Sequence, residues 1–408
     1  MENHTSALII GAGPVGLSAA LELGRRGVPC TVVERHRRLG RRSRVAGVNK
    51  WTMELFHYWG IGDEIHRAAL PFGATGPVTW KRTLAGETLG PIRRDASRPE
   101  TWSPTVARAG DIMFCPSDAV ESALLAAVRR CPSVDIHFST RLRGFENTEE
   151  GVTAELTYGN GEPGLVRADY LLACDGINSG VRKMLGIPLD GMRMDMDLVA
   201  IDFEADLRTW TGERPCVAYW IINSVSCGCL VPRLEGPRWI YTAFRRPDAA
   251  VATEEWCEDV VRAATGVPTL PLRITDAQPR SMTIEVVSQF RSRRVFLAGD
   301  AAHRFLPMLG PGINLGVHDA YDFAWKAAAV WERWADPTLL DTYEPQRAAA
   351  AKRTSEHTAE FLRLMAETGI SADVYDFATA LEEDGEDAAA LREMVRDAAR
   401  KLEGHWAT

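Results

Sequence analysis

A glycine-rich turn near the N-terminus limits the fold of this chain more than any other feature. The turn spans Gly11 to Gly16 and reads Gly-Ala-Gly-Pro-Val-Gly, which matches the pattern GxGxxG. It follows the apolar run Ala7 to Ile10, typical of a buried parallel strand, and opens a run of helix formers from Val15 to Arg26. Gly27 ends that run, and Cys30 to Val33 has the composition of a second strand. The sequence therefore predicts a βαβ unit at its start.

Each glycine of the turn has a mechanical role in such a unit. The first allows a tight turn, the second lets the backbone approach a pyrophosphate, and the third lets the helix pack on the strand. The start of the helix offers free N–H groups and a positive dipole end to phosphates. Glu34, at the end of the second strand, can accept hydrogen bonds from ribose hydroxyls. A turn without a ligand is the alternative, which this context disfavours. The motif alone does not separate FAD from a nicotinamide dinucleotide.

Composition and charge exclude some classes of function. The 408 residues allow two or three domain-sized units, and 46% hydrophobic with 25% charged residues is ordinary for a soluble globular protein. A formal net charge of -8 argues against nucleic-acid binding through bulk charge, which needs a basic surface. The basic run Arg35 to Arg44 stands apart. Composition favours a solvated loop for this run, and contact with phosphates is the alternative.

We expect neither a membrane span nor a signal peptide. No apolar run is long enough to cross a bilayer, and no basic segment precedes a longer apolar stretch. The eight cysteines are scattered without a CxxC pair, and Cys227 and Cys229 would share one face of a strand. No disulfide framework or zinc site is expected, because His303 and His318 also lack ligand spacing with nearby acids or cysteines. Reduced thiols fit a cytoplasmic protein best.

The pattern of predicted elements changes along the chain and then returns. Between Asp197 and Phe244, aromatic and β-branched residues alternate with turns, which favours an antiparallel sheet. After Gln289 the chain returns to the first pattern, and the final stretch is mostly helical. We interpret this as a second domain inserted into the first. The predicted boundaries are residues 1–74, 104–190 and 290–345 for the first domain, 75–103 and 191–289 for the second, and 346–408 for a C-terminal helical segment.

Two further motifs each follow a predicted buried strand. Cys174 to Arg182 reads Cys-Asp-Gly-Ile-Asn-Ser-Gly-Val-Arg, and Gly299 to His303 reads Gly-Asp-Ala-Ala-His. The second leads through a Pro/Gly loop to Gly312-Ile313-Asn314 and a helix that runs to about Trp334. Asn314 is predicted as the N-cap of that helix.

With the glycine turn, these motifs resemble the aromatic-hydroxylase family of flavoprotein monooxygenases. That family includes p-hydroxybenzoate hydroxylase, phenol hydroxylases and polyketide hydroxylases. The resemblance extends to Trp51–Phe56 and Leu340–Glu344, and so covers nearly the whole chain. It implies an α/β fold: a Rossmann-like FAD-binding domain with a parallel sheet and βαβ unit, an inserted, mostly antiparallel β-sheet substrate domain, and C-terminal helices.

The resemblance implies roles at FAD for residues of the first motif. Gly11, Gly13 and Gly16 would cradle the pyrophosphate, and Glu34 would hold the adenosine ribose. Arg44 stands where the family has a basic contact near the phosphates, so the end of the basic run would face the cofactor. Three neighbours complete the contacts expected here: Pro14, Val15 and Arg35.

The two later motifs would contact the rest of the cofactor. Asp175 and Gly176 would lie beside the pyrophosphate, where the family also admits NADPH or NADH. Asp300 would bind the ribityl or phosphate portion. The stretch Gly312-Ile313-Asn314 would place N–H groups at the pyrimidine edge of the flavin, where a helix N-terminus favours the negative charge of reduction. The remaining expected cofactor contacts are Ser117, Gly299, Pro307 and Gly310.

This sequence departs from the family at three positions near the expected flavin ring. Ser117 stands where many relatives have Gln and would make a shorter contact. Leu306 stands where proline is frequent, and Pro311 replaces a frequent Gln and has no N–H to donate. These changes put the loop geometry and substrate shape in question more than FAD binding.

The implied chemistry is carried by the cofactor. In the family, NADPH or NADH reduces FAD, O2 adds to the reduced flavin, and the flavin hydroperoxide transfers oxygen to an electron-rich ring. Candidates for a base that deprotonates a phenol are His303, Tyr219 and Tyr241, and Pro307, in the Pro/Gly loop, is also expected at the catalytic site. Alternatively, His303 is a structural histidine, and Tyr219 and Tyr241 are core residues whose hydroxyls have hydrogen-bond partners. The aromatic strands either line an apolar substrate cavity or form a packed sheet face.

Three other functions stay open at this point. A flavin-dependent epoxidase and a Baeyer–Villiger oxygenase share the same motifs, whereas a halogenase is disfavoured because WxWxIP is absent. A non-catalytic FAD-binding redox sensor is disfavoured by the intact Asp175, Asp300 and Gly312–Asn314 motifs. We expect an aromatic small molecule and O2 as partners. Self-association into a homo-oligomer stays open.

Overall fold

The chain divides into two compact units, each built from segments that are distant in sequence. The computed structural model describes residues 3–40, 45–69, 78–91, 113–212, 215–233, 236–246, 253–306, 310–371 and 373–405. The first unit comprises Met1–Ala69, Ser103–Met192 and Thr283–Glu356, and the second comprises Leu70–Trp102, Arg193–Met282 and His357–Thr408. Residues 346–408, predicted as a separate helical segment, are therefore divided between the two units.

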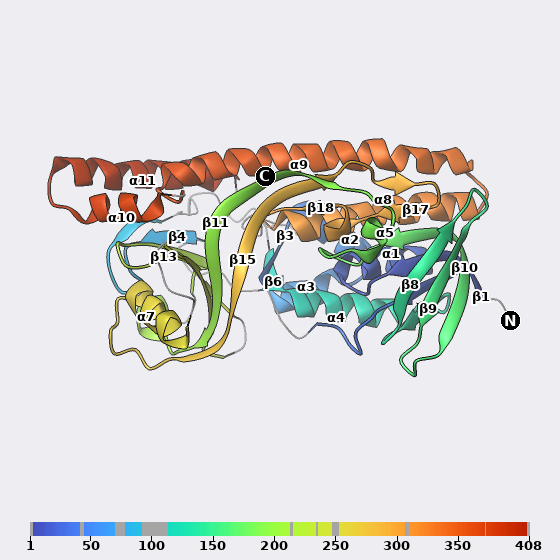
Figure 1. Cartoon of the computed structure of the whole chain (residues 1–408), viewed down its shortest axis with the longest axis horizontal. Helices are drawn as coiled ribbons and strands as arrows, with labels where there is room; N and C mark the ends of the chain where they lie inside the picture. The colour runs from blue at the N-terminus through green and yellow to red at the C-terminus, as the bar shows by residue number, and fades with distance from the viewer. Residues whose placement is uncertain are drawn as a thin grey trace. The chain divides into compact units, whose positions relative to one another are not determined.

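The first unit is a mixed sheet with helices (Figure 1). Its strands are β1 (Asn3–Ile10), β2 (Cys30–Val33), β3 (Val45–Val48), β6 (Met113–Pro116), β7 (Val134–His137), β8 (Arg141–Asn147), β9 (Val152–Thr157), β10 (Pro163–Ala173), β16 (Arg291–Ser292), β17 (Val295–Leu297) and β18 (His303–Arg304). Its helices are α1 (Pro14–Arg25), α2 (Lys50–Tyr58), α3 (Gly62–Ala68), α4 (Ser117–Val128), α5 (Gly180–Met184) and α8 (Pro311–Trp331), with the 3₁₀ turns η2 (Gly299–Ala301) and η4 (Pro337–Thr342).

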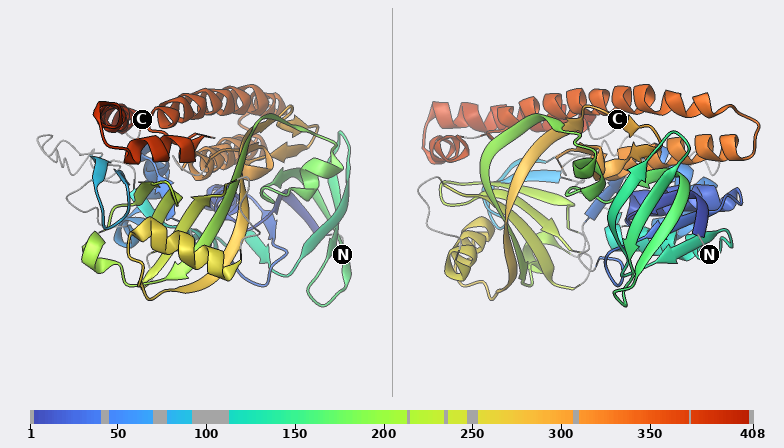
Figure 2. Two further views of the ribbon diagram at one scale, coloured as in Figure 1. Left: turned by 60° about the vertical axis from the view of Figure 1, so that its left-hand side comes forward. Right: turned by 45° about the vertical axis from the view of Figure 1, so that its right-hand side comes forward.

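The main sheet of this unit has the strand order β16-β17-β10-β1-β2-β7. β17, β10, β1, β2 and β7 are mutually parallel, whereas β8, β9 and the start of β10 form an antiparallel ribbon, the green strands of Figure 2. β2, β17 and the paired ends of β1 and β10 are buried and mostly apolar, as expected for a sheet whose faces are covered, whereas β7 at the edge of the sheet is only partly buried. Helix α1 packs against both α4 and α8. The predicted βαβ opening is confirmed, and the fold class is α/β.

An aromatic cluster forms the part of the core where β17 meets α8 and the next helix, α9 (Tyr343–Glu367). The ring of Phe296 lies 5.0 Å from that of Phe323 and 5.3 Å from that of Tyr343, and all three side chains are buried. The Tyr343 hydroxyl donates a hydrogen bond of 2.8 Å to the carbonyl of Leu297, and so fastens α9 to β17. Glu344 accepts the N–H groups of Phe290 and Arg291 nearby. These bonds give the Leu340–Glu344 segment its structural purpose.

The second unit contains a mostly antiparallel sheet. Its sheet has the order β18-β15-β11-β14-β13-β12-β4-β5, and β11 and β15 begin or end in the first unit. The predicted antiparallel meander is confirmed. Its elements are β4 (Val78–Lys81), β5 (Thr88–Pro91), β11 (Leu189–Glu204), α6 (Arg208–Thr211), β12 (Ala218–Ile222), β13 (Cys227–Pro232), β14 (Arg238–Phe244), α7 (Glu254–Thr265), β15 (Arg273–Val287), α10 (Val374–Glu382) and α11 (Glu386–His405).

The two faces of this sheet differ because successive side chains of a strand point to opposite sides. One face packs against α7, the yellow helix in Figure 2, and forms a closed core. Its residues include Ile201, Tyr219, Leu230, Tyr241, Cys257, Val260, Val261 and Ala264. A cross-strand row on the other face contains Ala200, Thr242, Cys229, Trp220 and Trp80.

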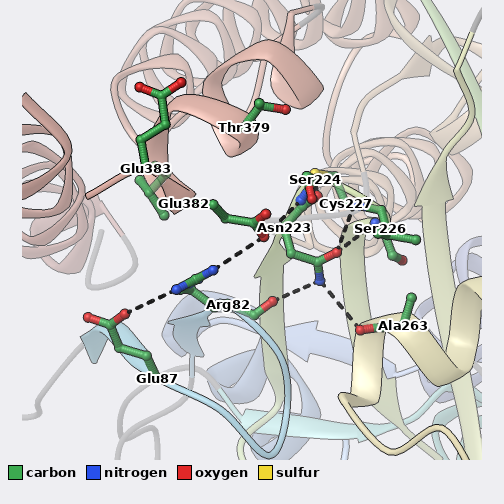
Figure 3. A network of polar contacts seen from close by, with 12 residues as sticks. Arg82, Glu87, Asn223, Ser224, Ser226, Cys227, Ala263, Thr379, Glu382 and Glu383 are labelled. Atoms are coloured by element: carbon green, nitrogen blue, oxygen red, sulfur yellow. Dashed lines mark hydrogen bonds and ion pairs between the residues drawn. The ribbon is translucent and has the colours of Figure 1, made fainter. Parts of the chain in front are cut away.

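A polar network ties three parts of the second unit together (Figure 3). The buried Asn223 donates to the carbonyls of Arg82 and Ala263 and accepts the N–H group of Ser226. Glu382, at the end of α10, accepts the N–H of Ser224 at 3.1 Å and pairs with Arg82 at 3.4 Å. The acidic stretch that begins at Glu382 joins α10 to α11, and its first residue holds α10 to the sheet.

No helix in the described part of the chain is both long and apolar enough to cross a lipid bilayer. All eight cysteines lie within that part, and all are free thiols. The described residues also contain no group of His, Cys, Asp and Glu side chains that could hold a metal ion.

Truncation of the aromatic cluster should destabilise the first unit strongly. For Phe296→Ala we expect a loss of about 3–5 kcal/mol in the free energy of unfolding, because a large buried ring leaves a cavity. Leu165→Ala is the control, since this side chain is 61% exposed. Chemical denaturation of both variants measures the difference, and an equal loss in the two would contradict the assigned core.

Candidate cofactor site

The three glycines of the N-terminal turn meet different surroundings. Gly11 has φ +107°, and a Cβ there would lie 2.4 Å from the carbonyl oxygen of Cys174. A Cβ on Gly16 would lie 2.0 Å from the carbonyl oxygen of Gly11. Both positions therefore require glycine for packing. Gly13 does not, because no atom of the described residues, apart from its chain neighbours and the backbone of its own helix, lies within 4 Å of a Cβ placed there. The open space at Gly13 is the room that a close-approaching phosphate group needs.

Donor groups and an acid surround this open space. Gly13 is the N-cap of α1 without a side-chain cap bond, and Pro14 is the first helical residue. The N–H groups of Val15 and Gly16, in the first turn, therefore have no partner within the helix. Glu34 Oε2 accepts the N–H of Ala12 at 3.0 Å, which fixes the carboxylate at the turn. The predicted proximity of acid and glycine turn is thus present in the structure.

The basic run is only partly described. Arg35 is exposed, and its Nε lies 3.2 Å from Nε2 of His36. The backbone N–H of His36 donates to Glu34 Oε1 at 2.9 Å, so the residue after Arg35 helps to orient the acid. Arg44 lies outside the described residues.

The Asp175–Gly176 turn lies beside the first glycine turn. β10 runs parallel to β1, with Ala173 opposite Ile10, so both strands end at the same edge. Asp175 Oδ2 accepts the N–H groups of Gly180 and Val181 at 2.7 and 3.1 Å. Its Oδ1 is buried and has no hydrogen-bond partner among the described residues. Gly176 has φ +78°, and a Cβ there would meet no atom of the residues that the structure describes within 4 Å. An unused carboxylate oxygen and open backbone fit a polar ligand at this edge.

The Gly299–Asp300 turn packs between two helices. Gly299 has φ +60°, and a Cβ there would lie 2.8 Å from Cγ2 of Val15 in α1. A Cβ on Gly316, in α8, would lie 2.6 Å from the same methyl group. Asp300 is exposed, and its Oδ1 lies 3.6 Å from the Cβ position of Gly312. This close packing brings the third motif to the start of α1 and to the start of α8.

The helix after the Pro/Gly loop starts earlier than predicted. α8 begins at Pro311 with Gly310 as its N-cap, so the prediction of Asn314 as the N-cap is wrong. The Asn314 side chain instead donates to the carbonyls of Gly47 and Gly310 at 2.7 Å each and accepts the N–H of Asn49 at 3.0 Å. It joins the start of α8 to β3, which the local sequence pattern could not show.

One departure from the family is explained by this geometry. Pro311 occupies the first helical position, where an N–H has no partner within the helix in any case. The N–H groups of Gly312 and Ile313 follow it and also have no partner within the helix. Ser117 is the first residue of α4 and follows β6, whose Pro116 pairs with Val45 of β3. Leu306 is buried, and Pro307 lies outside the described residues.

These features together fit FAD. Open backbone occurs at two glycine turns, an unpartnered carboxylate oxygen lies at one of them, and two helix N-termini present N–H groups. The site uses strand ends of one parallel sheet, where ligands of such folds bind. The predicted cofactor residues that the structure brings into this neighbourhood are Gly11, Gly13, Pro14, Val15, Gly16, Glu34, Asp175, Gly176, Gly299, Asp300, Gly310, Gly312, Ile313 and Asn314.

The candidate bases lie in closed cores. Tyr219 lies on the sheet face packed against α7, and its hydroxyl accepts the N–H of Cys216 at 2.8 Å. Tyr241 lies on the same face and shares a hydrogen bond of 2.8 Å with Ser226. Burial raises the pKa of both hydroxyls, which opposes formation of a phenolate base. For both tyrosines the geometry favours the packed sheet face over a cavity wall.

His303 is also buried, with no exposed side-chain surface. Its Nε2 lies 2.6 Å from Oδ2 of Asp319. The structural alternative is therefore favoured for this histidine over the role of base. Sequence reasoning missed Asp319 and its second partner, Arg347. A buried acid inside a helix and an arginine beyond the next turn carry no local pattern, because only the packed fold brings them together.

Comparisons with known proteins agree with this site. Residues 4–358 match the family model described as FAD binding domain. A putative polyketide hydroxylase of Streptomyces halstedii is 35% identical over 378 residues, which take in 87% of this chain and 66% of that protein. Tetracenomycin A2 monooxygenase-dioxygenase of Streptomyces glaucescens is 36% identical over 370 residues, 83% of this chain and 64% of that protein. The chain thus spans less than two thirds of the length of either relative.

A solved structure has the same fold over nearly the whole chain. The flavin-dependent monooxygenase PieE, in complex with FAD and substrate, superposes with a TM-score of 0.85 at 28% identity. The superposition covers 99% of this chain and 72% of that one.

Substitution of Gly13 should separate cofactor binding from folding. In Gly13→Ala the new methyl group meets no neighbouring atom in the described part of the chain, but it fills the space assigned to a phosphate. We expect the dissociation constant of FAD to rise at least roughly tenfold, whereas the melting temperature of the apoprotein changes by no more than about 2 °C. Titration of apoprotein with FAD and thermal unfolding provide the two measurements.

Gly144→Ala, in β8, is the matched control, since its Cβ makes only an ordinary contact with Glu155. Equal FAD affinity in the two variants would show that the phosphate lies elsewhere.

Proposed function

The chain belongs to the FAD binding domain family, and we propose that it is a flavin-dependent monooxygenase that hydroxylates an aromatic small molecule of phenol or polyketide type. NADPH or NADH would serve as electron donor and O2 as the oxygen source. The observation that carries the proposal is the convergence of Gly13, Asp175 and Asp300 at the strand ends of one parallel sheet. Identity above one third with a putative polyketide hydroxylase and a tetracenomycin monooxygenase-dioxygenase supports the substrate class.

The proposal assigns a task to each part of the site. The N–H groups of Val15 and Gly16 would bind the diphosphate at the dipole end of α1. Glu34, already oriented by Ala12 and His36, would accept bonds from the ribose. Bound FAD would supply electron transfer from the nicotinamide donor and the activation of oxygen.

The flavin ring would lie at the start of α8. The N–H groups of Gly312 and Ile313 would donate to its pyrimidine edge, and the positive end of the helix would favour negative charge there. Asp300 would bind the ribityl chain, since it lies beside Gly312. Gly310 would let the start of the helix pack closely against Gly47, because a Cβ at Gly310 would lie only 2.7 Å from the carbonyl oxygen of Gly47.

We assign substrate binding to the second unit, on the sheet face opposite α7. The α7 face is closed, because Tyr219, Tyr241 and the helix fill it. The other face presents Ala200, Thr242 and Cys229 in one row, and the last two side chains are half-buried. A small, largely apolar surface of this kind suits a planar aromatic molecule, with Thr242 as a hydroxyl partner. No side chain of this row is a strong base, so binding rather than proton transfer is its proposed task.

A reducing compartment suits this protein. All eight cysteines are free thiols, and most are buried. Burial raises the pKa of Cys115, Cys227 and Cys229 to about 12, which suppresses their reactive thiolate form. We therefore propose the cytoplasm as its location.

The activity is tested by a screen of phenols and aromatic polyketides with the FAD-loaded protein. We expect a substrate to accelerate oxidation of NADPH or NADH in the presence of O2, and product mass analysis to show a gain of one oxygen atom. The Gly13→Ala variant is the control, because it should lose turnover together with FAD.

The position of the added oxygen distinguishes the remaining flavoenzyme activities. A ring hydroxyl supports the proposal, whereas an epoxide or a ring-expanded ester identifies an epoxidase or a Baeyer–Villiger oxygenase. A yellow, FAD-loaded protein that responds to neither donor across the screen would contradict the proposed enzyme and favour a redox sensor.

A further inference from the structure

The carboxylate of Asp319, on α8, gathers three donors in the core of the first unit. Oδ2 accepts the backbone N–H of Gly299 at 3.0 Å and Nε2 of His303 at 2.6 Å. Oδ1 accepts Nε of Arg347 at 2.6 Å. Burial alone would raise the pKa of Asp319, but the charge of Arg347 and the bonds from His303 and Gly299 bring it down to about 2. The group is therefore a carboxylate throughout the neutral range.

His303 joins this network through its Nε2. Its side chain is completely buried, and its Nδ1 has no hydrogen-bond partner among the described residues. Among the described residues, His303 thus makes its ring hydrogen bond through Nε2 alone, to the Asp319 carboxylate.

The network holds a backbone group rather than an exposed side chain. Gly299 starts the turn that carries Asp300, and it is packed against Val15 of α1 and Gly316 of α8. The bond from its N–H to Asp319 ties this turn to α8. The same helix presents the N–H groups of Gly312 at its N-terminus. One hydrogen bond therefore helps to set the separation between Asp300 and the start of α8.

We propose that Asp319 is a positioning residue that adjusts FAD affinity and the potential of the bound flavin through the Gly299–Asp300 turn. The inference rests on the proposed placement of FAD at Gly13, Asp300 and Gly312. His303 and Arg347 hold the carboxylate, and none of the three would touch the cofactor. His303 thereby has a task other than the base that its position in the motif first indicated.

Asp319→Asn tests this proposal, because it keeps the size of the side chain and removes its charge. We expect the dissociation constant of FAD to rise at least roughly tenfold, as expected for loss of a charge-assisted bond. We also expect the midpoint potential of the bound flavin to fall, because a displaced helix N-terminus stabilises the reduced, negatively charged form less. Titration of the full-length apoprotein and anaerobic redox titration of the holoprotein measure the two effects.

Asp322→Asn is the matched control on the same helix. Asp322 pairs with the buried Lys326 at 2.7 Å, and Lys326 also donates to Gln346, but neither bond reaches the Gly299 turn. This variant should lose stability. Its dissociation constant for FAD should stay within about twofold of the wild-type value, and its flavin potential should equal that of the wild type within experimental error. Equal effects on affinity and potential in the two variants would overturn the proposal and leave Asp319 a general structural residue.

A second pair of variants decides the question if Asp319→Asn does not fold. His303→Gln keeps an N–H donor near the position of Nε2, whereas His303→Leu removes it. The proposal expects His303→Gln to restore affinity and potential relative to His303→Leu, and equal values in both would overturn it. If Gly13→Ala binds FAD as the wild type does, the placement of FAD fails instead, and that result is distinct from a failure at Asp319.

Discussion

The contact of Val15 with two glycines is the constraint on which the cofactor site depends. Gly299 and Gly316 leave no room for a side chain beside the Val15 methyl group, so the glycine turn, the Gly299–Asp300 turn and α8 must meet there. The N-terminal glycine turn is thereby brought to the same edge of the sheet as two segments that are distant from it in sequence. The hydrogen bond from Gly299 to Asp319 then fixes the turn in this tight arrangement. Packing brings the three segments together, and the buried Asp319 carboxylate orients the Gly299–Asp300 turn.

Much of the first unit was predictable because its signals are local. The glycine spacing, the apolar strand runs and Glu34 predicted the βαβ opening, and β2 has the predicted limits Cys30–Val33. Asn314 was misplaced because a positive-φ glycine, Gly310, starts the helix earlier, and the asparagine bonds to β3 instead. Asp319 and Arg347 could not be found in this way, since their meeting depends on how α8 and α9 pack.

In the second unit, strand composition predicted the sheet but not its faces. Tyr219 and Tyr241 are aligned across neighbouring strands through Leu230, and this register places both on the side that α7 covers. A shift of one residue would have turned them to the other side. The role of an aromatic residue in such a sheet is therefore decided by register and by the helix that covers it. The row of Ala200, Thr242 and Cys229 became a candidate surface only once that register was known.

The order of strands in the first sheet also has a consequence for synthesis of the chain. β1 is made before β2 and β10, yet it lies between these two strands in the sheet. Its second neighbour, β10, is complete only when Ala173 has been made, and Gly299 and α8 follow much later. Until then the nascent chain exposes an apolar strand with one unpaired edge, which is prone to association with other chains. The growing polypeptide thus needs protection at least until β10 has been made, and the complete flavin site exists only after the Gly299–Asp300 turn and α8 have been made.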